Sequence, residues 1–179
     1  MPSLFETSRL LIHSIQLSTD INPLLALHNH LPTMRWIPNT KTPWTEEDLV
    51  KKYNINLSLY PKRLGLYKIL LKTQTEPILL GEVGLFPYQE TTSDIEIGYI
   101  LHEVYWKKGL ATELLFALEQ FIQQHLSYTT IRAQLFSSNL NSKNLLERCS
   151  YQYESTSQIT DNLSKLMYTK NISTNKKQG

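Results

Sequence analysis

The stretch DIEIGYILHEVYWKKGLATELLFALEQFIQQH, from Asp94 to His125, decides the fold. In its first part, Asp94–His102, successive side chains would point to two opposite faces, as they do in a strand. One face carries Ile95, Ile97, Tyr99 and Leu101, and the other carries Glu96, Gly98, Ile100 and His102. From Gly109 the apolar residues recur with the period of a helix, which is expected to reach about Gln124. The stretch therefore predicts a strand, a turn near Gly109 and a long helix.

The first third of the chain is expected to form a strand followed by helices. Ser8–Ser14 is an apolar stretch that predicts an opening strand, and leucines at helical spacing over 24–31 predict a helix after it. A loop is expected where three prolines follow: Pro32, Pro38 and Pro43. Thr45 with Asp48 three residues later resembles a capping box, which begins a helix to about Leu59.

Strands are expected on both sides of the central stretch. Gly65–Lys72 and Ile78–Phe86 are predicted to pair as a hairpin. The elements predicted after the long helix are a strand at Thr129–Phe136, a short helix at Ser142–Arg148, and a closing pair of strands at Tyr151–Thr156 and Lys165–Ile172. This order indicates an α/β (α+β) fold with a mixed sheet of about seven strands and about four helices on both faces.

Length and composition set the class of protein. The 179 residues, 41% hydrophobic and 19% charged, fit one soluble domain, which we assign to 1–172 with a polar tail at 173–179. A net charge of +2 with scattered Lys and Arg disfavours a nucleic-acid partner. The single cysteine, Cys149, excludes an internal disulfide. With no apolar run near the ~18 residues of a membrane span, the chain is expected to be cytoplasmic without a membrane partner.

Two conspicuous residue types are interpreted as structural. His28 and His30 resemble a metal pair, but no Cys, Asp or third His lies nearby in the sequence, so no metal site is predicted. Cys149 follows an apolar helix face and is expected to be a small buried residue.

The turn before the long helix has the features of an anion site. The first N–H groups of a helix have no partner inside it, and the helix dipole adds positive charge there. Gly109 lets a ligand approach the backbone, and Lys107 and Lys108 add charge. A phosphate group is the ligand such a turn attracts, although many similar turns are plain connections.

The residues of this turn resemble the acetyl-CoA-binding motif of the GNAT superfamily of N-acetyltransferases. In that motif Gln or Arg is followed after two residues by Gly, and after one more by Gly or Ala. Trp106, Gly109 and Ala111 take these three places, and tryptophan at the first is similar to the branch of ribosomal-protein N-terminal acetyltransferases (RimJ/RimL-like). The preceding Glu96–Tyr99, EIGY, is also similar to that branch.

Two further blocks carry the same resemblance, which spans about Glu6 to Ile172. ETSRLLI, Glu6–Ile12, looks like the first strand of the branch. Asn139, Ser142 and the residues up to Arg148 resemble its pattern of Asn, two residues, Ser and a short helix. That helix usually ends in Gly-Phe, where this chain has Ser150-Tyr151, and losing the glycine is expected to cost backbone freedom at the helix exit.

The resemblance implies a sheet splayed into a V that holds acetyl-CoA. The implied backbone partners of pantetheine are Tyr99, Ile100, Leu101 and His102. The implied pyrophosphate segment is Trp106, Lys107, Lys108, Gly109, Leu110, Ala111 and Thr112. Asn139, Ser142 and Asn144 would then lie beside the thiol end.

Acetyl transfer requires a neutral amine, so a base must take its proton. Glu103 matches the position of the proposed base in the branch, and Glu96 could act through a water; a solvated strand-end carboxylate is the alternative for both. Ser142 matches the residue proposed to protonate the leaving thiolate. Because a hydroxyl is a weaker acid than a thiol, we interpret it as a hydrogen-bond donor to sulfur, with capping of the short helix as the alternative.

The sequence therefore predicts an acetyl-CoA-dependent N-acetyltransferase that acts by direct attack. The acceptor is a protein N-terminus or a small-molecule amine, and the chain is a monomer or a homodimer. Trp36 and Trp44 would either line the acceptor site or anchor the core. The alternative function is a GNAT-like module that binds acyl-CoA without turnover.

Overall fold

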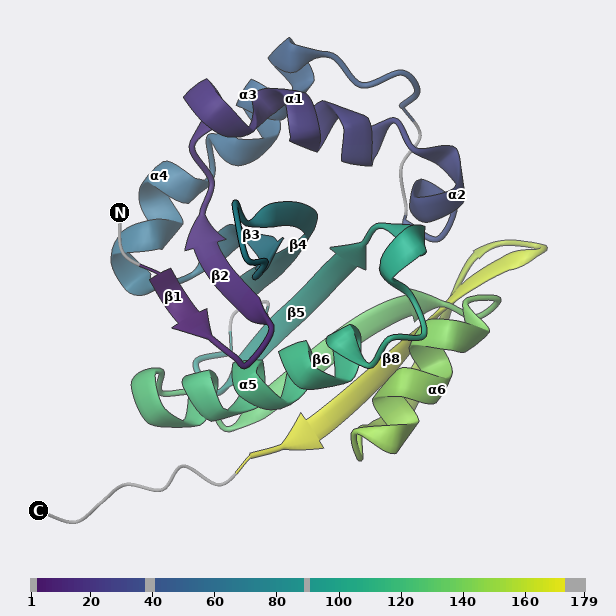
Figure 1. Ribbon diagram of the computed structural model, residues 1–179. Helices are drawn as coiled ribbons and strands as arrows, with labels where there is room; N and C mark the ends of the chain where they lie inside the picture. The colour runs from purple at the N-terminus through teal and green to yellow at the C-terminus, as the bar shows by residue number, and fades with distance from the viewer. Residues whose placement is uncertain (1–2, 38–40, 89–90, 173–179) are drawn as a thin grey trace, which may run out of the picture. The chain divides into compact units, whose positions relative to one another are not determined.

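Eight strands form one sheet in the computed structural model, which describes residues 3–37, 41–88 and 91–172. Their hydrogen-bonded order is β1-β2-β3-β4-β5-β6-β8-β7 (Figure 1). The strands are β1 (Ser3–Glu6), β2 (Leu10–Ser14), β3 (Gly65–Leu71), β4 (Ile78–Pro87), β5 (Asp94–Leu101), β6 (Thr130–Phe136), β7 (Gln152–Thr160) and β8 (Leu163–Asn171). Mixed sheet topology is confirmed, because β5 and β6 run parallel whereas β1–β2, β2–β3, β3–β4, β6–β8 and β7–β8 are antiparallel.

The helices follow the predicted order, but the helix expected over 45–59 is divided in two, and an additional short helix follows the first one. They are α1 (Leu17–His28), α2 (Leu31–Met34), α3 (Glu46–Tyr53), α4 (Asn56–Leu59), α5 (Leu110–His125) and α6 (Leu140–Arg148), with 3-10 turns η1 (Tyr60–Lys62) and η2 (Glu103–Tyr105). None of the helices in the described part of the chain is long and apolar enough to cross a membrane.

Chain contacts divide the described residues into two compact units. The first is made from Met1–Leu85 and Tyr99–Leu110, and the second from Phe86–Gly98 and Ala111–Gly179. Each unit therefore combines segments that are distant in the sequence. The predicted tail 173–179 lies outside the described residues.

The opening strand of the first unit was predicted with the wrong start. Residues 7–9 form a turn, in which the N–H of Leu10 donates to Oγ1 of Thr7 at 2.8 Å. β1 precedes this turn and pairs with β2, as in Phe5 opposite Ile12. The four-residue strand β1 has no alternation long enough to be recognised, which is why about seven strands were expected.

In the helical segment of the first unit, the predicted capping box is confirmed. One of the prolines expected in the loop lies in a helix instead. The N–H of Thr45 donates to Oδ2 of Asp48 at 2.8 Å, and the N–H of Asp48 donates back to Oγ1 of Thr45 at 3.3 Å. Pro32 was expected in a loop but lies in the first turn of α2, where its missing N–H costs nothing. Pro38 falls outside the described residues.

Two small cores hold the helices of this unit to the sheet. Leu24 of α1 packs with Leu49 and Tyr53 of α3, and Trp44 lies against them. A second cluster joins Leu27, Met34 and Ile100. Ile100 was expected on the more polar face of its strand, yet it is buried because α1 and α2 bring apolar side chains to that face.

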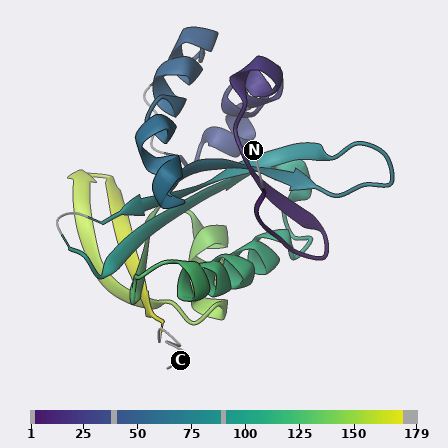
Figure 2. The same ribbon diagram turned by 90° about the vertical axis from the view of Figure 1, so that its left-hand side faces the viewer.

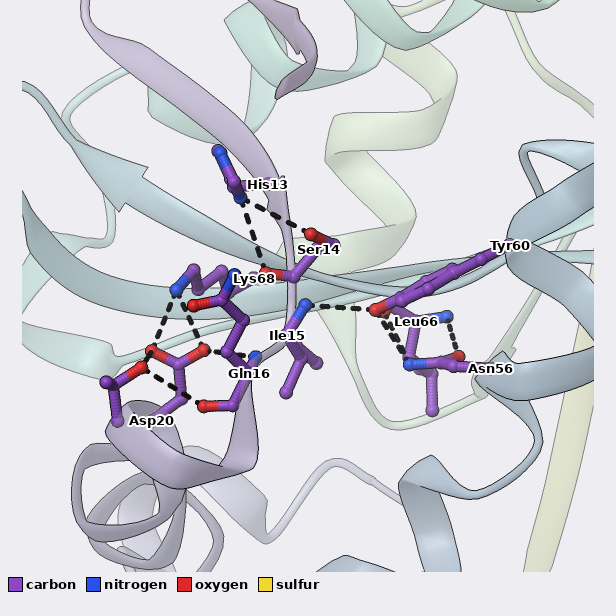
Figure 3. Close-up of polar contacts among 10 residues, drawn as sticks. His13, Ser14, Ile15, Gln16, Asp20, Asn56, Tyr60, Leu66 and Lys68 are labelled. Atoms are coloured by element: carbon purple, nitrogen blue, oxygen red, sulfur yellow. Dashed lines mark hydrogen bonds and ion pairs between the residues drawn. The ribbon is translucent and has the colours of Figure 1, made fainter. Parts of the chain in front are cut away.

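An ion pair fixes the first turn of α1 on β3 (Figure 3). Lys68 donates to both carboxylate oxygens of Asp20, at 2.8 and 2.7 Å, and the N–H of Gln16 donates to the same carboxylate at 2.7 Å. Beside it, Asn56 and Tyr60 both donate to the carbonyl oxygen of Leu66. This anchoring fixes the first turn of α1, and residues 28–30 lie at the other end of the helix.

In the second unit, the parallel pairing of β5 with β6 is short. It runs from Asp94 opposite Thr130 to Ile97 opposite Ala133, although the strands continue to Leu101 and Phe136. β8 pairs with β6 on one edge and with β7 on the other, and Figure 2 shows β7 and β8 side by side.

Polar contacts tie both helices of the second unit to β8. Lys170 on β8 donates to Oε2 of Glu119 on α5 at 2.7 Å. Tyr168 on the same strand donates to Oε1 of Glu147 on α6 at 2.8 Å.

Candidate active site

The predicted phosphate turn has two residues in the left-handed backbone region. They are Lys107, with φ of 60°, and Gly109, with φ of 76°. Glycine adopts this conformation without strain, whereas lysine pays about 1 kcal/mol for it. Leu110 is buried and begins α5, with Ala111 and Thr112 in the first helical turn. The N–H groups of such a turn attract anions, so the local fold suits a phosphate group.

Arg9 holds this turn from the start of the chain. Its Nη1 donates to the carbonyl oxygen of Lys108 at 2.9 Å. Nη2 lies 3.5 Å from the place where a β-carbon on Gly109 would be. The guanidinium therefore adds a third positive charge beside Lys107 and Lys108. Sequence reasoning missed Arg9 because 99 positions separate it from Lys108.

At the end of β5, the backbone N–H and C=O groups of successive residues point alternately to the two edges of the strand. The N–H of His102 donates to the carbonyl oxygen of Leu80 on β4 at 2.8 Å, and the carbonyl oxygen of Ile100 points at Gly81 on the same strand. Since alternate residues of a strand point their hydrogen-bonding groups to opposite edges, Tyr99 and Leu101 face away from β4. The implied pantetheine contacts are therefore better suited to Tyr99 and Leu101 than to the N–H groups of Ile100 and His102.

The side chain of Trp106 binds the end of β5, the strand that precedes it in the chain. Its indole N–H donates to the carbonyl oxygen of Leu101 at 2.6 Å. The ring thus fixes how the chain leaves β5 and enters the turn. Next to it, the ammonium of Lys108 lies 5.4 Å from the ring centroid of Tyr105.

Glu103 begins η2 and meets α2, a proximity that the sequence did not predict. The N–H of Glu103 donates to Oγ1 of Thr33 at 3.0 Å. Oγ1 of Thr33 also lies 2.8 Å from Nδ1 of His30. Nε2 of His30 is 4.0 Å from Oε1 of Glu103, and both side chains are about one-third exposed, at 29% and 36%.

His102 lies against the same group. Its ring centroid is 4.1 Å from that of His30, and its Nδ1 accepts the N–H of Val104 at 3.4 Å. Burial lowers the pKa of His102, and the positive charge of His30 lowers it further, while Glu103 acts in the opposite direction. Because Nδ1 is an acceptor, the neutral ring carries its proton on Nε2.

Glu96, the other predicted carboxylate, belongs to the second unit. Its side chain is half-buried, and burial raises its pKa, which the charge of Lys165 partly offsets. It stands opposite Arg132 in the parallel register.

The Asn139 block lies at the start of α6 in the second unit. Asn139 is the N-cap, and its Oδ1 accepts the N–H of Ser142 at 3.1 Å. The helix begins at Leu140, so Ser142 lies in its first turn, and the capping that was the alternative role of Ser142 is performed by Asn139. Asn144 is exposed further along the helix. At the exit, Ser150 has φ of 65°, so a serine holds the left-handed position where the family has glycine.

Trp36 and Trp44 differ in their surroundings. Trp44 packs on the Leu24 cluster and its ring centroid is 4.8 Å from that of His28, which favours core anchoring. Trp36 is partly buried and carries the guanidinium of Arg35 over its ring at 4.9 Å.

A buried charged network beside Trp44 went unnoticed in the sequence. Glu82 on β4 is 3% exposed, and its carboxylate accepts from Lys52 and, at 2.5 Å, from Tyr53. His28 lies 3.3 Å from the same carboxylate. Burial alone would raise the pKa of Glu82, but the charge of Lys52 and the contacts with His28 lower it to about 2. His28 and His30 thus face different partners, and the described residues contain no cluster of three metal-binding side chains.

Comparisons with solved structures agree with this architecture. An acetyltransferase of the GNAT family from Bacillus anthracis matches with a TM-score of 0.77 and 22% identity, covering 93% of this chain and 96% of that one. RimL, a ribosomal L7/L12 alpha-N-protein acetyltransferase solved with coenzyme A, matches with a TM-score of 0.78 and 17% identity over 97% and 99% of the two chains. The microcin C7 self-immunity acetyltransferase MccE, solved with acetyl-CoA and AMP, gives 0.76 and 16% over 93% and 94%.

At these identities the solved structures establish the fold, and the sequence family is established separately. None of the curated proteins compared with the chain is similar enough to count as a relative. The family model for the acetyltransferase (GNAT) domain matches residues 9–152, which include the turn at Gly109 and the Asn139 block. This chain therefore belongs to the GNAT acetyltransferase domain family.

Proposed function

We propose that the protein transfers the acetyl group of acetyl-CoA to a primary amine by direct attack. The observation that carries this proposal is the turn at Lys107–Gly109, which leads into α5 and is held by Arg9. RimL and MccE, which share the fold, were solved with coenzyme A and acetyl-CoA. The acceptor is a protein N-terminus, the class of substrate that the name of RimL gives, or a small-molecule amine.

The cofactor is proposed to bind along the end of β5. The positive groups of Arg9, Lys107 and Lys108 suit a diphosphate at the start of α5, where Leu110, Ala111 and Thr112 provide N–H groups. Tyr99 and Leu101 are the proposed backbone partners of pantetheine.

The bound thioester would supply an activated acetyl group. The residues of the chain must then remove a proton from the amine and stabilise the leaving thiolate. At pH 7 roughly a tenth of an α-amine but under a thousandth of a lysine side chain is neutral, so an α-amine needs less help. Glu103, which is partly exposed in the first unit, is the proposed proton acceptor, and Ser142 is the proposed hydrogen-bond donor to sulfur.

The test is release of coenzyme A thiol from acetyl-CoA with a panel of amines. The panel holds a peptide with a free α-amine, the same peptide with its α-amine blocked, a polyamine and an aminoglycoside antibiotic. Release with at least one acceptor, and addition of one acetyl group by mass spectrometry, is expected. Binding of coenzyme A in calorimetry without turnover of any amine would favour the non-catalytic module instead.

Two matched variants test which carboxylate acts in proton removal. Glu103→Gln is expected to lower kcat by about 10²-fold, the usual contribution of a general base. Glu96→Gln removes the same charge from the second unit and is expected to leave kcat within about twofold. The reverse ranking would transfer the role to Glu96. Unchanged affinity for coenzyme A in both variants shows that the fold is intact.

A further inference from the structure

His30, Thr33 and Glu103 form a linked group of side chains at the start of η2. His30 and Thr33 come from the region of α2, whereas Glu103 follows β5. The hydroxyl of Thr33 connects them, because it accepts the N–H of Glu103 at 3.0 Å and lies 2.8 Å from Nδ1 of His30. This bridge holds the imidazole beside the backbone of Glu103, whose carboxylate lies 4.0 Å from Nε2.

The two ring nitrogens of His30 have different tasks in this arrangement. A threonine oxygen has two lone pairs, so it can accept the N–H of Glu103 and the Nδ1–H of His30 together. With its proton on Nδ1, neutral His30 has a basic Nε2. That nitrogen faces Oε1 of Glu103 at 4.0 Å.

One small polar group could bridge His30 and Glu103 from the side. A distance of 4.0 Å is too long for a direct hydrogen bond, which for N and O atoms is about 2.9 Å. An amine nitrogen could approach both Nε2 and Oε1 at that distance. The pair is accessible to solvent, since the side chains of His30 and Glu103 are 29% and 36% exposed.

We propose that His30 is a second catalytic residue through which Glu103 acts: the proton of the acceptor amine goes to Nε2 of His30 and not directly to Glu103, and the carboxylate of Glu103 stabilises the imidazolium. This inference rests on the proposed acetyl transfer. The N–H bond of the ammonium breaks and the Nε2–H bond forms. The amine lone pair then forms the C–N bond to the acetyl carbonyl, and the C–S bond breaks with its electron pair on sulfur. The nitrogen of the new amide loses its second proton to solvent, the proton on His30 also passes to solvent, and the thiolate takes one proton from solvent.

Imidazole suits this task better than a carboxylate alone. Histidine is the side chain that exchanges protons near neutral pH, where a general base is most effective. The titratable groups facing His30 are Glu103, whose Oε1 lies 4.0 Å from Nε2, and His102, whose ring centroid lies 4.1 Å away. Burial and the charge of His30 lower the pKa of His102, so a positive charge on this stacked ring is less favourable than on an ordinary histidine.

The test compares His30→Asn and His30→Ala with His125→Gln, a matched change of an exposed histidine in the last turn of α5. Asparagine at position 30 can keep a hydrogen bond to Oγ1 of Thr33 in place of the Nδ1 contact, but it has no base in place of Nε2. We expect kcat of His30→Asn to fall by about 10²-fold, with KM for acetyl-CoA and the melting temperature nearly unchanged. His125→Gln should retain wild-type kcat.

Two readouts separate proton transfer from a purely structural role. Added imidazole should restore part of the activity of His30→Ala. Within the acceptor class that the amine panel identifies, the defect of His30→Asn should shrink as the amine becomes less basic. Full activity of His30→Asn, or an equal defect for all amines without imidazole rescue, would overturn the assignment of His30 alone. A wild-type protein that turns over no amine would overturn the acetyltransferase proposal itself, and the assignment with it.

Discussion

The carbonyl oxygen of Ile100 lies only 1.9 Å from where a β-carbon on Gly81 would be. β4 and the end of β5 therefore approach each other at a point that no side chain can occupy. His102, Glu103 and the phosphate turn all follow this point in the chain, so the close approach determines where the proposed site begins.

Gly81→Ala is expected to destabilise the protein by about 3 kcal/mol or to prevent folding, because two backbones would have to move apart. Urea unfolding measures the change. Gly98→Ala is the matched control, since nothing lies within 4 Å of a β-carbon there. It should be neutral or slightly stabilising, and equal losses in both variants would contradict the steric explanation.

Glu82→Gln is expected to lower the free energy of unfolding by about 3–5 kcal/mol near neutral pH, because Lys52 loses its buried partner. The folded-state pKa of Glu82 is lowered from 4.5 to about 2, so its contribution is complete above about pH 4.5 and is lost as the pH falls toward 2. The wild type should therefore lose stability across this window and the variant should lose less.

Urea titrations at several pH values measure this difference. Glu76→Gln, an exposed change in the turn between β3 and β4, serves as the control and should follow the wild-type curve. If the free energy of unfolding of Glu82→Gln and of the wild type changed in parallel below pH 4.5, the ionised carboxylate of Glu82 would not be the source of this pH dependence.

Ser150→Gly is expected to stabilise the protein by about 1 kcal/mol, because glycine adopts the left-handed conformation of this position without a clash. Thermal unfolding gives the sign. The same substitution at Ser155, on the exposed strand β7, should destabilise instead, since glycine only adds flexibility there. A loss of stability in Ser150→Gly would contradict the explanation that the backbone of Ser150 is strained.

Gly109→Ala is expected to weaken coenzyme A binding about tenfold, through about 1 kcal/mol of backbone strain at φ of 76° and a blocked approach to the turn. Arg9→Gln should also weaken binding, because the turn loses its contact at Lys108. Calorimetry with coenzyme A measures both, and Arg148→Gln, exposed at the end of α6, controls for the lost charge. Wild-type affinity in Gly109→Ala would remove the turn from the binding site.

Asn139→Ala and Ser142→Ala are expected to separate capping from catalysis. The first removes the N-cap of α6 and should cost about 1 kcal/mol of stability. The second should leave stability near wild type but lower kcat about tenfold, the value of one hydrogen bond to the departing sulfur. A Ser142→Ala enzyme with full kcat would exclude that contact.

Local patterns were sufficient to predict most elements. The alternation in β5, the helical period of α5 and the pairing of Thr45 with Asp48 each depend on residues a few positions apart. Such patterns reflect local backbone geometry, which the chain carries wherever it folds. β1 was missed because a strand of four residues offers too short a pattern.

The sequence by itself determined the family, the turn at Gly109 and Glu103 as a candidate base, because these lie in contiguous motifs. Only the tertiary structure decided which groups surround them. Arg9 reaches Lys108, His30 reaches Glu103, and Lys52 meets Glu82. In each pair the residues are at least 30 positions apart in the chain, and their contact arises from strand pairing and helix packing, which no local pattern encodes.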